Sequence, residues 1–215
     1  FFPLIDDNGK EQWVFSGACG HYMIGSFDGK IFDPKTRVKK FEQGTNGYAA
    51  QTWSNAPDNR RIQISWMASG LYPEMPFNQQ LSIPVELKLR GFGENMQVTR
   101  WPISEIESLR KRSIEIKKQE ISKTNPLNPT TSTKLLDVEF TLKKNGAPHF
   151  YVVVRGQPLL FNFVDNKLNF RPSGQFKGLE DRQASLLPDG ETLEVRLLVD
   201  NTSLEVFINE GTFSA

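Results

Sequence analysis

Residues 136–142 read Leu-Asp-Val-Glu-Phe-Thr-Leu, with an apolar side chain at every second position. The same alternation returns at 193–200 and at 204–208. Successive side chains of a β-strand point to opposite faces, so this period of two predicts strands with one buried face and one solvated face. The solvated face expected for 193–200 carries Glu194, Arg196, Leu198 and Asp200. The repeated pattern predicts an all-β fold.

Strands are expected along most of the remaining chain. They are predicted at residues 13–18, 21–27, 48–53, 61–67, 85–90, 96–100, 150–155, 159–164 and 167–170. The pairs Asp28-Gly29, Asn145-Gly146 and Asp189-Gly190 are typical of tight hairpin turns.

One helix is expected between the two β-rich parts of the chain. Ser104 and Glu107 have the spacing of a capping box, and Ile103, Ile106 and Leu109 have helical spacing. The basic residues 110–112 suit the end of a helix, where the backbone dipole favours positive charge.

This helix divides the chain into two units, at residues 1–102 and 103–215. The second unit has about seven short strands in roughly a hundred residues, which suggests a β-sandwich. Residues 122–132, rich in Pro, Thr and Ser, are expected to form a loop. The first unit has too few strands to close a sheet alone, and about two blades of a β-propeller would fit it.

The chain begins at Phe1 without a methionine and stops at Ala215, shortly after a strand and a turn. A strand left after a turn normally needs a partner. These ends favour a piece of a longer protein, and the alternative is a complete domain with trimmed ends.

The composition excludes several classes of function. Lys and Arg number 26 against 25 Asp and Glu, so the net charge of +1 gives no electrostatic reason to expect nucleic acid as a partner. The one cysteine, Cys19, excludes an internal disulfide framework, and His21 and His149 are too far apart for a histidine metal motif. No apolar run approaches the length of a transmembrane helix. Cys19 and His21 together are expected to be structural, in a hairpin.

The unusual feature of the first unit is a group of aromatic residues near a carboxylate. Tyr48, Trp53 and Trp66 lie on two consecutive predicted strands, and Glu42 comes just before them. An aromatic ring can cover the apolar face of a sugar while a carboxylate accepts hydrogen bonds from its hydroxyls. The alternative is that these aromatic residues belong to the core.

Several stretches carry a resemblance to a known family. Residues 48–53 (YAAQTW) followed by 60–67 (RRIQISWM) resemble the Y-A-A-x-T-[FW] … G-R-R-x-x-x-G-W-M stretch of glycoside hydrolase family 32, which includes invertases, levanases and inulinases. Residues 13–29, 81–87 and 198–211 are similar to three further motifs of that family, in the same order. The resemblance therefore extends along essentially the whole chain.

The resemblance implies the last blades of a five-bladed β-propeller followed by a β-sandwich. It implies cleavage of β-fructofuranosidic bonds in levan, inulin or sucrose by a retaining mechanism, without metal or organic cofactor, in a secreted or periplasmic protein. The family's N-D-P, R-D-P and E-x-P-D motifs, which carry its catalytic carboxylates, are absent from this chain. The resemblance thus implies no catalytic residue here, an inactive isolated chain, and a missing N-terminal propeller portion as its partner.

Two substrate-binding residues are carried over from the family. Glu42 falls where the family has an aspartate in D-x-G that bonds fructosyl hydroxyls, and Trp66 falls on its subsite tryptophan. The chain departs from the family pattern at several positions near the expected pocket. These are Glu42 for Asp, Asn46 and Gly47 for an acidic-aromatic pair, Ser65 for Gly and Val85 for Arg.

Two other functions remain open for the second unit. It could be a carbohydrate-binding module, which would need an exposed aromatic platform, or a structural domain that braces the propeller. Its aromatic residues mostly fit strand alternation and are expected in the core. They are Phe140, Phe150, Phe161, Phe163, Phe170 and Phe207.

Overall fold

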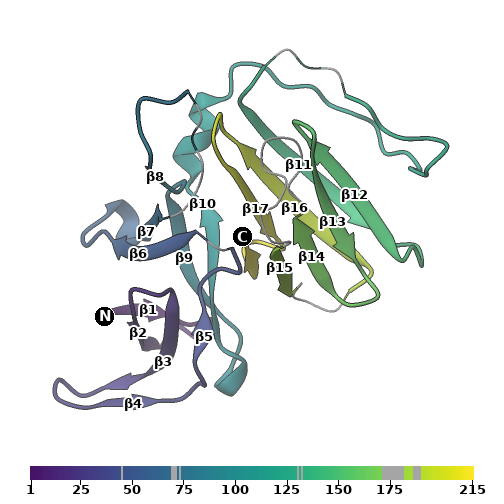
Figure 1. Ribbon diagram of the computed structural model, residues 1–215. Coiled ribbons are helices and arrows are strands. Elements are labelled where there is room, and N and C mark those ends of the chain that lie inside the picture. The colour runs from purple at the N-terminus through teal and green to yellow at the C-terminus, as the bar shows by residue number, and fades with distance from the viewer. Residues whose placement is uncertain are drawn as a thin grey trace.

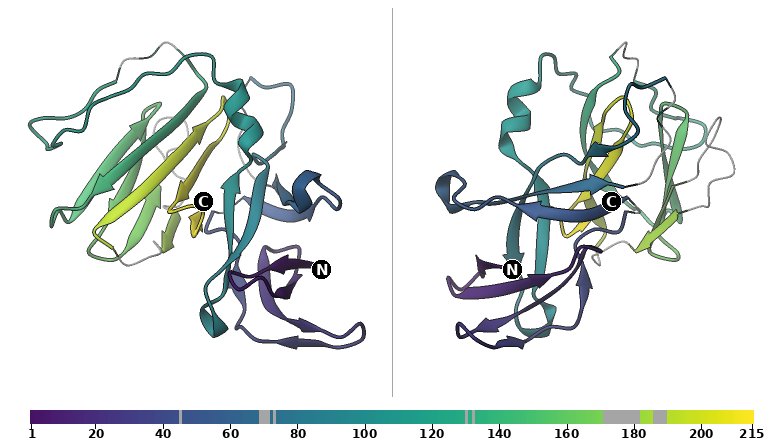
Figure 2. Two further views of the ribbon diagram at one scale, coloured as in Figure 1. Left: turned by 180° about the vertical axis from the view of Figure 1, so that it is seen from behind. Right: turned by 60° about the vertical axis from the view of Figure 1, so that its left-hand side comes forward.

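The protein folds into four antiparallel sheets, seen in the computed structural model of Figure 1. The structure describes residues 1–44, 46–68, 72, 74–129, 131, 133–170, 182–185 and 190–215. Two sheets come from the first half of the chain and two from the second half. In Figure 2 the first pair lies to one side of the second pair, and the chain ends close to where they meet.

The first two sheets are meanders of sequential strands, as in propeller blades. The first sheet consists of β1 (Phe2–Ile5), β2 (Glu11–Ser16), β3 (His21–Phe27), β4 (Phe32–Pro34) and β5 (Lys39–Lys40). The second consists of β6 (Gly47–Thr52), β7 (Arg61–Met67), β8 (Gln80–Leu81), β9 (Val85–Arg90) and β10 (Gln97–Pro102).

The other two sheets pack face to face as a sandwich. The third sheet consists of β11 (Leu136–Lys143), β16 (Thr192–Val199), β17 (Leu204–Ile208) and β18 (Phe213–Ser214). The fourth consists of β12 (His149–Val154), β13 (Gln157–Asn162), β14 (Lys167–Phe170) and β15 (Arg182–Ser185). Residues such as Phe161, Leu197 and Ile208, all fully buried, form the core between them.

A second core lies between the two propeller sheets and continues into the sandwich. It includes Val14, Ile24 and Val85, together with Leu198 and Phe207 from the third sheet. The third sheet is therefore buried on both faces at β16 and β17. One face packs on the fourth sheet, and the other packs on the propeller sheets.

This second contact corrects one expectation. Arg196, Leu198 and Glu205 were expected on solvated faces, and each is 6% exposed or less. The alternation itself is present, since Leu197 and Val206 face the sandwich core. The prediction of a solvated face on β16 and β17 is wrong. The alternation within a strand cannot show that the propeller sheets pack on the face that carries the polar residues.

The helix expectation is wrong in type. Residues 104–109 form a 3₁₀-helix, η3 (Ser104–Leu109), and Ile103 is its N-cap without a side-chain hydrogen bond. The capping box is not made, because Ser104 lies inside the helix and its hydroxyl donates to Glu105 instead. Two shorter 3₁₀-helices are η1 (Pro57–Asn59) and η2 (Gly93–Asn95).

The longer predicted strands are confirmed to within a few residues, and 21–27, 61–67, 85–90 and 167–170 have the predicted bounds. Asp28-Gly29 lies between the paired strands β3 and β4, as expected for a hairpin. The hairpin expected at Asn145-Gly146 is wrong, because this turn connects β11 to β12, which lie in different sheets, and Asp189 lies outside the described residues. The strands not predicted are mostly short or at a sheet edge, where few residues carry the alternation. They are β1, β4, β5, β8, β15 and β18.

Candidate substrate-binding site

Two of the three aromatic residues predicted to lie close together meet where β6 enters the second sheet. Tyr48 lies opposite Trp66 across the antiparallel β6–β7 pair, and their rings meet edge to face with centroids 5.9 Å apart. A register shift follows Tyr48, and Ala49 there has a φ of 47°. The Ala49 N–H donates to the Ala18 carbonyl of the first sheet at 2.7 Å. The bulge thus joins the two propeller sheets beside the aromatic pair.

Trp53 does not join this pair. Its backbone bonds to Ile62, at the opposite end of β7 from Trp66. Four residues of extended strand separate these positions by about 13 Å. Trp53 is 46% exposed, so it belongs to neither the core nor the aromatic pair.

Glu42 lies in residues 41–44, which connect the first sheet to β6. Its side chain is 17% exposed, and Oε2 accepts a hydrogen bond from Nη1 of Arg100 at 2.8 Å. A Cβ atom at Gly47 would overlap the Glu42 carboxylate. Gly47 therefore leaves the room that the longer Glu42 side chain fills.

The structure does not bring Glu42 and Trp66 together, since they lie on opposite faces of the second sheet. Gly47 pairs with Met67 while Tyr48 pairs with Trp66, and neighbouring residues on a strand point to opposite faces. Glu42 packs on the Gly47 side, beside Arg100, whereas Trp66 and Tyr48 share the other side. The binding roles of Glu42 and Trp66 stay predictions.

A buried polar network behind Glu42 was missed from the sequence. Arg100, on β10, is 2% exposed and donates through Nε to Gln63 at 3.1 Å and through Nη1 to Ser214 Oγ at 3.0 Å. Gln63 lies between Ile62 and Ile64 in the sequence, which is the pattern of a solvated position, so no local signal could have placed it or Arg100 in a buried network. Their partners lie far along the chain, so the network itself has no local signature.

A second carboxylate is buried where the second and third sheets meet. Glu205 on β17 accepts a hydrogen bond from the Ile83 N–H at 2.8 Å. Loss of solvation raises the pKa of Glu205 to about 7, although this amide and the positive charge of Arg100 act in the opposite direction. Glu42 and Asp200 add to the rise through their negative charge.

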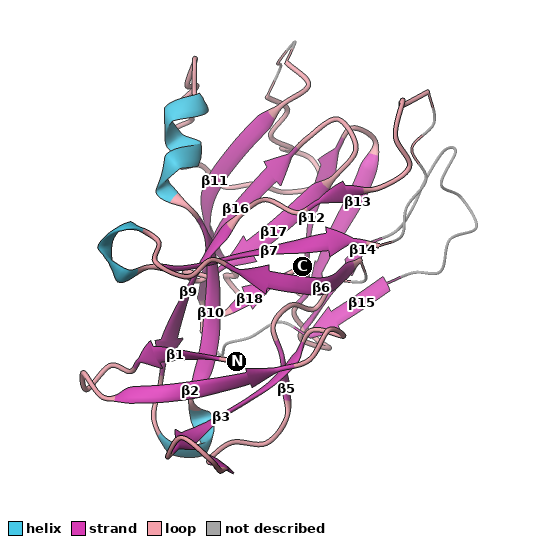
Figure 3. Ribbon diagram, turned by 90° about the vertical axis from the view of Figure 1, so that its left-hand side faces the viewer, coloured by secondary structure: helices cyan, strands magenta, loops and turns pink. Residues whose placement is uncertain are grey.

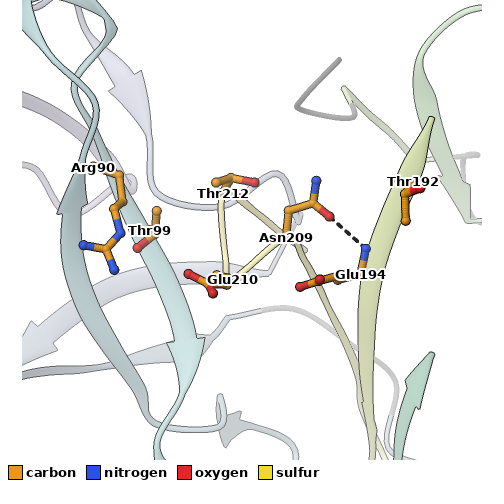
Figure 4. A pocket seen from close by; sticks show the side chains of 7 residues that line it. All are labelled: Arg90, Thr99, Thr192, Glu194, Asn209, Glu210 and Thr212. Atoms are coloured by element: carbon orange, nitrogen blue, oxygen red, sulfur yellow. Dashed lines mark hydrogen bonds between the residues drawn. The ribbon is translucent and has the colours of Figure 1, made fainter. Parts of the chain in front are cut away.

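An open polar cavity of about 480 Å³ lies between the second and third sheets (Figure 4). It is lined by Arg90, Thr99, Thr192, Glu194, Asn209, Glu210 and Thr212. The Asn209 side chain points across it and accepts a hydrogen bond from the Glu194 N–H at 2.8 Å. This lining has no aromatic ring, so the cavity differs from the aromatic site at Trp66.

Other sites considered from the sequence have limited chemistry. Cys19 Sγ lies 3.2 Å from His21 Nδ1 at an exposed turn, and the structure gives this pair no third orienting group among its described contacts. Within the described residues, no group of three His, Cys, Asp or Glu could hold a metal ion. In the same part of the chain, no helix has the length and apolar character to cross a membrane.

Comparison with known families accounts for both halves of the chain. The model of the family 32 glycosyl hydrolase N-terminal domain matches residues 10–102, and the model of the family 32 C-terminal region matches residues 105–215. The chain belongs to glycosyl hydrolase family 32. The family 32 fold is a five-bladed β-propeller followed by a β-sandwich, and the four sheets are the last blades and the sandwich of that fold.

Individual relatives agree with this assignment. The chain is 29% identical to a levanase of Bacillus subtilis (strain 168), over 97% of this chain and 36% of the levanase. It is 28% identical to a sucrose-6-phosphate hydrolase of Escherichia coli, over 85% of this chain and 38% of that protein. The chain therefore spans well under half the length of these relatives.

Solved structures show the same fold. An exo-inulinase from Aspergillus awamori superposes with a TM-score of 0.77 at 19% identity, over 99% of this chain and 49% of the inulinase. A β-fructofuranosidase from Schwanniomyces occidentalis, complexed with fructosyl-erythritol, also gives 0.77 at 19% identity, over 99% and 51% of the two chains.

Proposed function

We propose that this chain is part of a glycoside hydrolase that cleaves β-fructofuranosidic bonds in levan, inulin or sucrose by a retaining mechanism. The observation that carries the proposal is the pair of family 32 matches, which together extend from residue 10 to residue 215. The names of the relatives, levanase and sucrose-6-phosphate hydrolase, support the same class of substrate.

In this proposal the chain binds substrate and another part of a longer protein supplies the reaction. A retaining glycosidase needs a carboxylate nucleophile and a carboxylic acid about 5 to 5.5 Å apart. The family motifs that carry these groups are absent from residues 1–215, so the isolated chain is inactive. The reaction requires no metal or organic cofactor, since the two carboxylates carry out both proton transfer and covalent catalysis.

The proposed binding roles of Trp66 and Glu42 are separate contacts with the substrate, because the two side chains lie on opposite faces of the second sheet. Trp66, supported by the edge of Tyr48, offers an apolar ring face to the carbons of the sugar. Glu42 has one carboxylate oxygen bonded to Arg100, and its other oxygen is an acceptor for a sugar hydroxyl.

The partner in this proposal is a preceding propeller portion of the same protein. The outer face of the first sheet carries a cluster of aromatic rings: Phe1 stacks on Trp13 at 4.7 Å, and Phe15 stacks on Phe32 at 5.7 Å. Phe1 and Phe15 are each about half exposed, and an exposed apolar patch of this kind is typical of an interaction surface. A secreted or periplasmic location belongs to the same proposal, because membership of family 32 implies it.

The binding part of the proposal is tested by calorimetric titration with levan- and inulin-derived oligosaccharides, using the longest natural form of the protein. We expect Trp66→Ala to weaken binding about tenfold, the equivalent of roughly 1.4 kcal/mol. Trp53→Ala is the matched control, because Trp53 lies on the same hairpin but outside the aromatic pair. Equal affinity of the Trp66→Ala variant and the wild type would remove Trp66 from the site.

A further inference from the structure

Residues 41–44 carry Glu42 to the site and are anchored in the propeller core at their first residue. Phe41 is 7% exposed and stacks on Tyr22 with ring centroids 4.5 Å apart. Tyr22 is itself fixed, since its hydroxyl oxygen accepts a hydrogen bond from the Val98 N–H at 3.0 Å. The segment therefore starts from a rigid position.

Strand β18 of the sandwich holds the same segment, 41–44, from the other side. The Gln43 N–H donates to the Ser214 carbonyl at 2.7 Å, and the Ser214 hydroxyl donates to the Phe41 carbonyl at 3.5 Å. Gly44 also packs on this end of the chain, because a Cβ atom there would lie 3.3 Å from the carbonyl carbon of Ala215. Figure 3 shows β18 and the C-terminus beside the second sheet, near β6.

Arg100 connects the sandwich to the Glu42 side chain. Its Nη1 group donates both to Ser214 Oγ at 3.0 Å and to Glu42 Oε2 at 2.8 Å. Its backbone N–H donates to the Gly211 carbonyl at 3.0 Å, so the arginine is bonded to the sandwich at both ends. The Nε group of Arg100 donates a third side-chain hydrogen bond, to Gln63 Oε1 at 3.1 Å.

These contacts fix the direction of the Glu42 carboxylate. One oxygen accepts a hydrogen bond from Arg100. The carboxylate also fills the space beside Gly47 that a Cβ atom would otherwise occupy. A carboxylate held in this way meets a hydroxyl without first losing rotamer freedom, which is how supporting residues improve a binding site.

We propose that Arg100 and Ser214 are positioning residues for the fructosyl-binding site, so that the sandwich holds the binding segment 41–44 in place. This role rests on the proposed function, because it assigns Glu42 to a fructosyl hydroxyl. It gives the sandwich a part in substrate affinity beyond bracing the propeller.

The test compares Arg100→Gln and Ser214→Ala with two matched controls. Arg196→Gln removes an equally buried arginine from the sandwich, and Ser108→Ala removes a hydroxyl bonded to a backbone carbonyl at η3. Hydrogen exchange of the amides of residues 41–44, 46 and 47 is measured first, on the chain itself. KM and kcat for levan and sucrose are then measured in the longest natural form of the protein.

We expect amide exchange in residues 41–44, 46 and 47 to rise at least tenfold in both test variants and to stay unchanged in both controls. KM should rise about fivefold while kcat stays within twofold, and Arg100→Lys should recover part of the affinity because a cation again faces Glu42. Unchanged exchange in Arg100→Gln and Ser214→Ala overturns the positioning role, and so does faster exchange without a change in KM. A wild-type protein that cleaves no β-fructoside instead overturns the proposed function, and the exchange result then still shows whether the segment is held by the sandwich.

Discussion

Arg100 and Arg196 are equally buried, each with a side chain that is 2% exposed, yet they hold the molecule together in different ways. Arg196 bonds Asp137 through two nitrogen atoms, at 3.0 and 2.9 Å, on the neighbouring strand of its own sheet. Arg100 bonds Glu42, Gln63 and Ser214, which lie 58, 37 and 114 residues away along the chain.

The difference shows what each arginine can transmit. The Arg196 pair stabilises the register of β11 and β16 within the sandwich. The Arg100 network links the segment before β6, the interior of the second sheet and the last strand of the sandwich. A change in the Arg100 network therefore reaches the candidate binding site through direct hydrogen bonds, whereas Arg196 contacts the second sheet only through the ring of Trp101, 5.7 Å from its guanidinium among the described contacts.

The largest predicted effect separates the two arginines by stability. Arg100→Met leaves Glu42 with no cation among the described residues, and breaking a buried ion pair in this way costs about 3 to 5 kcal/mol. Arg196→Met should cost about 1 to 3 kcal/mol, since Asp137 keeps Arg110 as a second partner at 2.6 Å. Urea unfolding of both variants measures the difference, and equal losses would show that the second cation makes no contribution.

A smaller effect concerns pH dependence at the contact between the propeller and the sandwich. Because the pKa of Glu205 in the folded protein is about 7, above its ordinary value of 4.5, the folded state binds the extra proton between these values. Its contribution to stability is present below pH 4.5 and is lost as the pH rises toward 7, by roughly 3 kcal/mol at most.

Glu205→Gln tests this dependence, since glutamine keeps an acceptor for the Ile83 N–H and does not ionise. The unfolding free energies of wild type and variant are measured at pH 5 and pH 8. Relative to the wild type, the variant should be more stable at pH 8 than it is at pH 5. A constant difference would mean that Glu205 titrates normally.

The smallest of these effects concerns the room beside Glu42. Gly47→Ala should cost about 1 to 3 kcal/mol, because the new Cβ overlaps a carboxylate that Arg100 holds in place. In a Glu42→Ala background the same substitution should cost less than about 0.5 kcal/mol, and a double-mutant cycle measures this coupling. The same cost in both backgrounds would show that the strain at Gly47 has another source.

The sequence predicted most of the fold because its long strands obey a period of two. It failed where the third sheet packs on the propeller, at Arg196, Leu198 and Glu205. A charged residue at an alternate position has the pattern of a solvated face, and only the second domain packed against it makes that face buried. The 3₁₀-helix at 104–109 was also given the wrong type, since spacing alone does not separate three residues per turn from 3.6.

The candidate site was predicted in part. Tyr48 and Trp66 could be placed together because they lie on adjacent strands of one hairpin. The partners of Glu42 could not be predicted, since Arg100 and Ser214 reach it only through the packing of three sheets. One sign was available in the sequence, since Gly47 and Glu42 both depart from the family pattern. In the structure the Glu42 carboxylate occupies the space that a side chain at position 47 would need.

The most direct test of the account is fructose release from levan, inulin and sucrose by the longest natural form of the protein, compared with the isolated chain. The account predicts that the longer form cleaves at least one of these substrates, that the isolated chain cleaves none, and that Trp66→Ala lowers kcat/KM of the longer form. A longer form that binds fructan but cleaves no β-fructofuranosidic bond would contradict it, and would leave a carbohydrate-binding protein on a hydrolase fold.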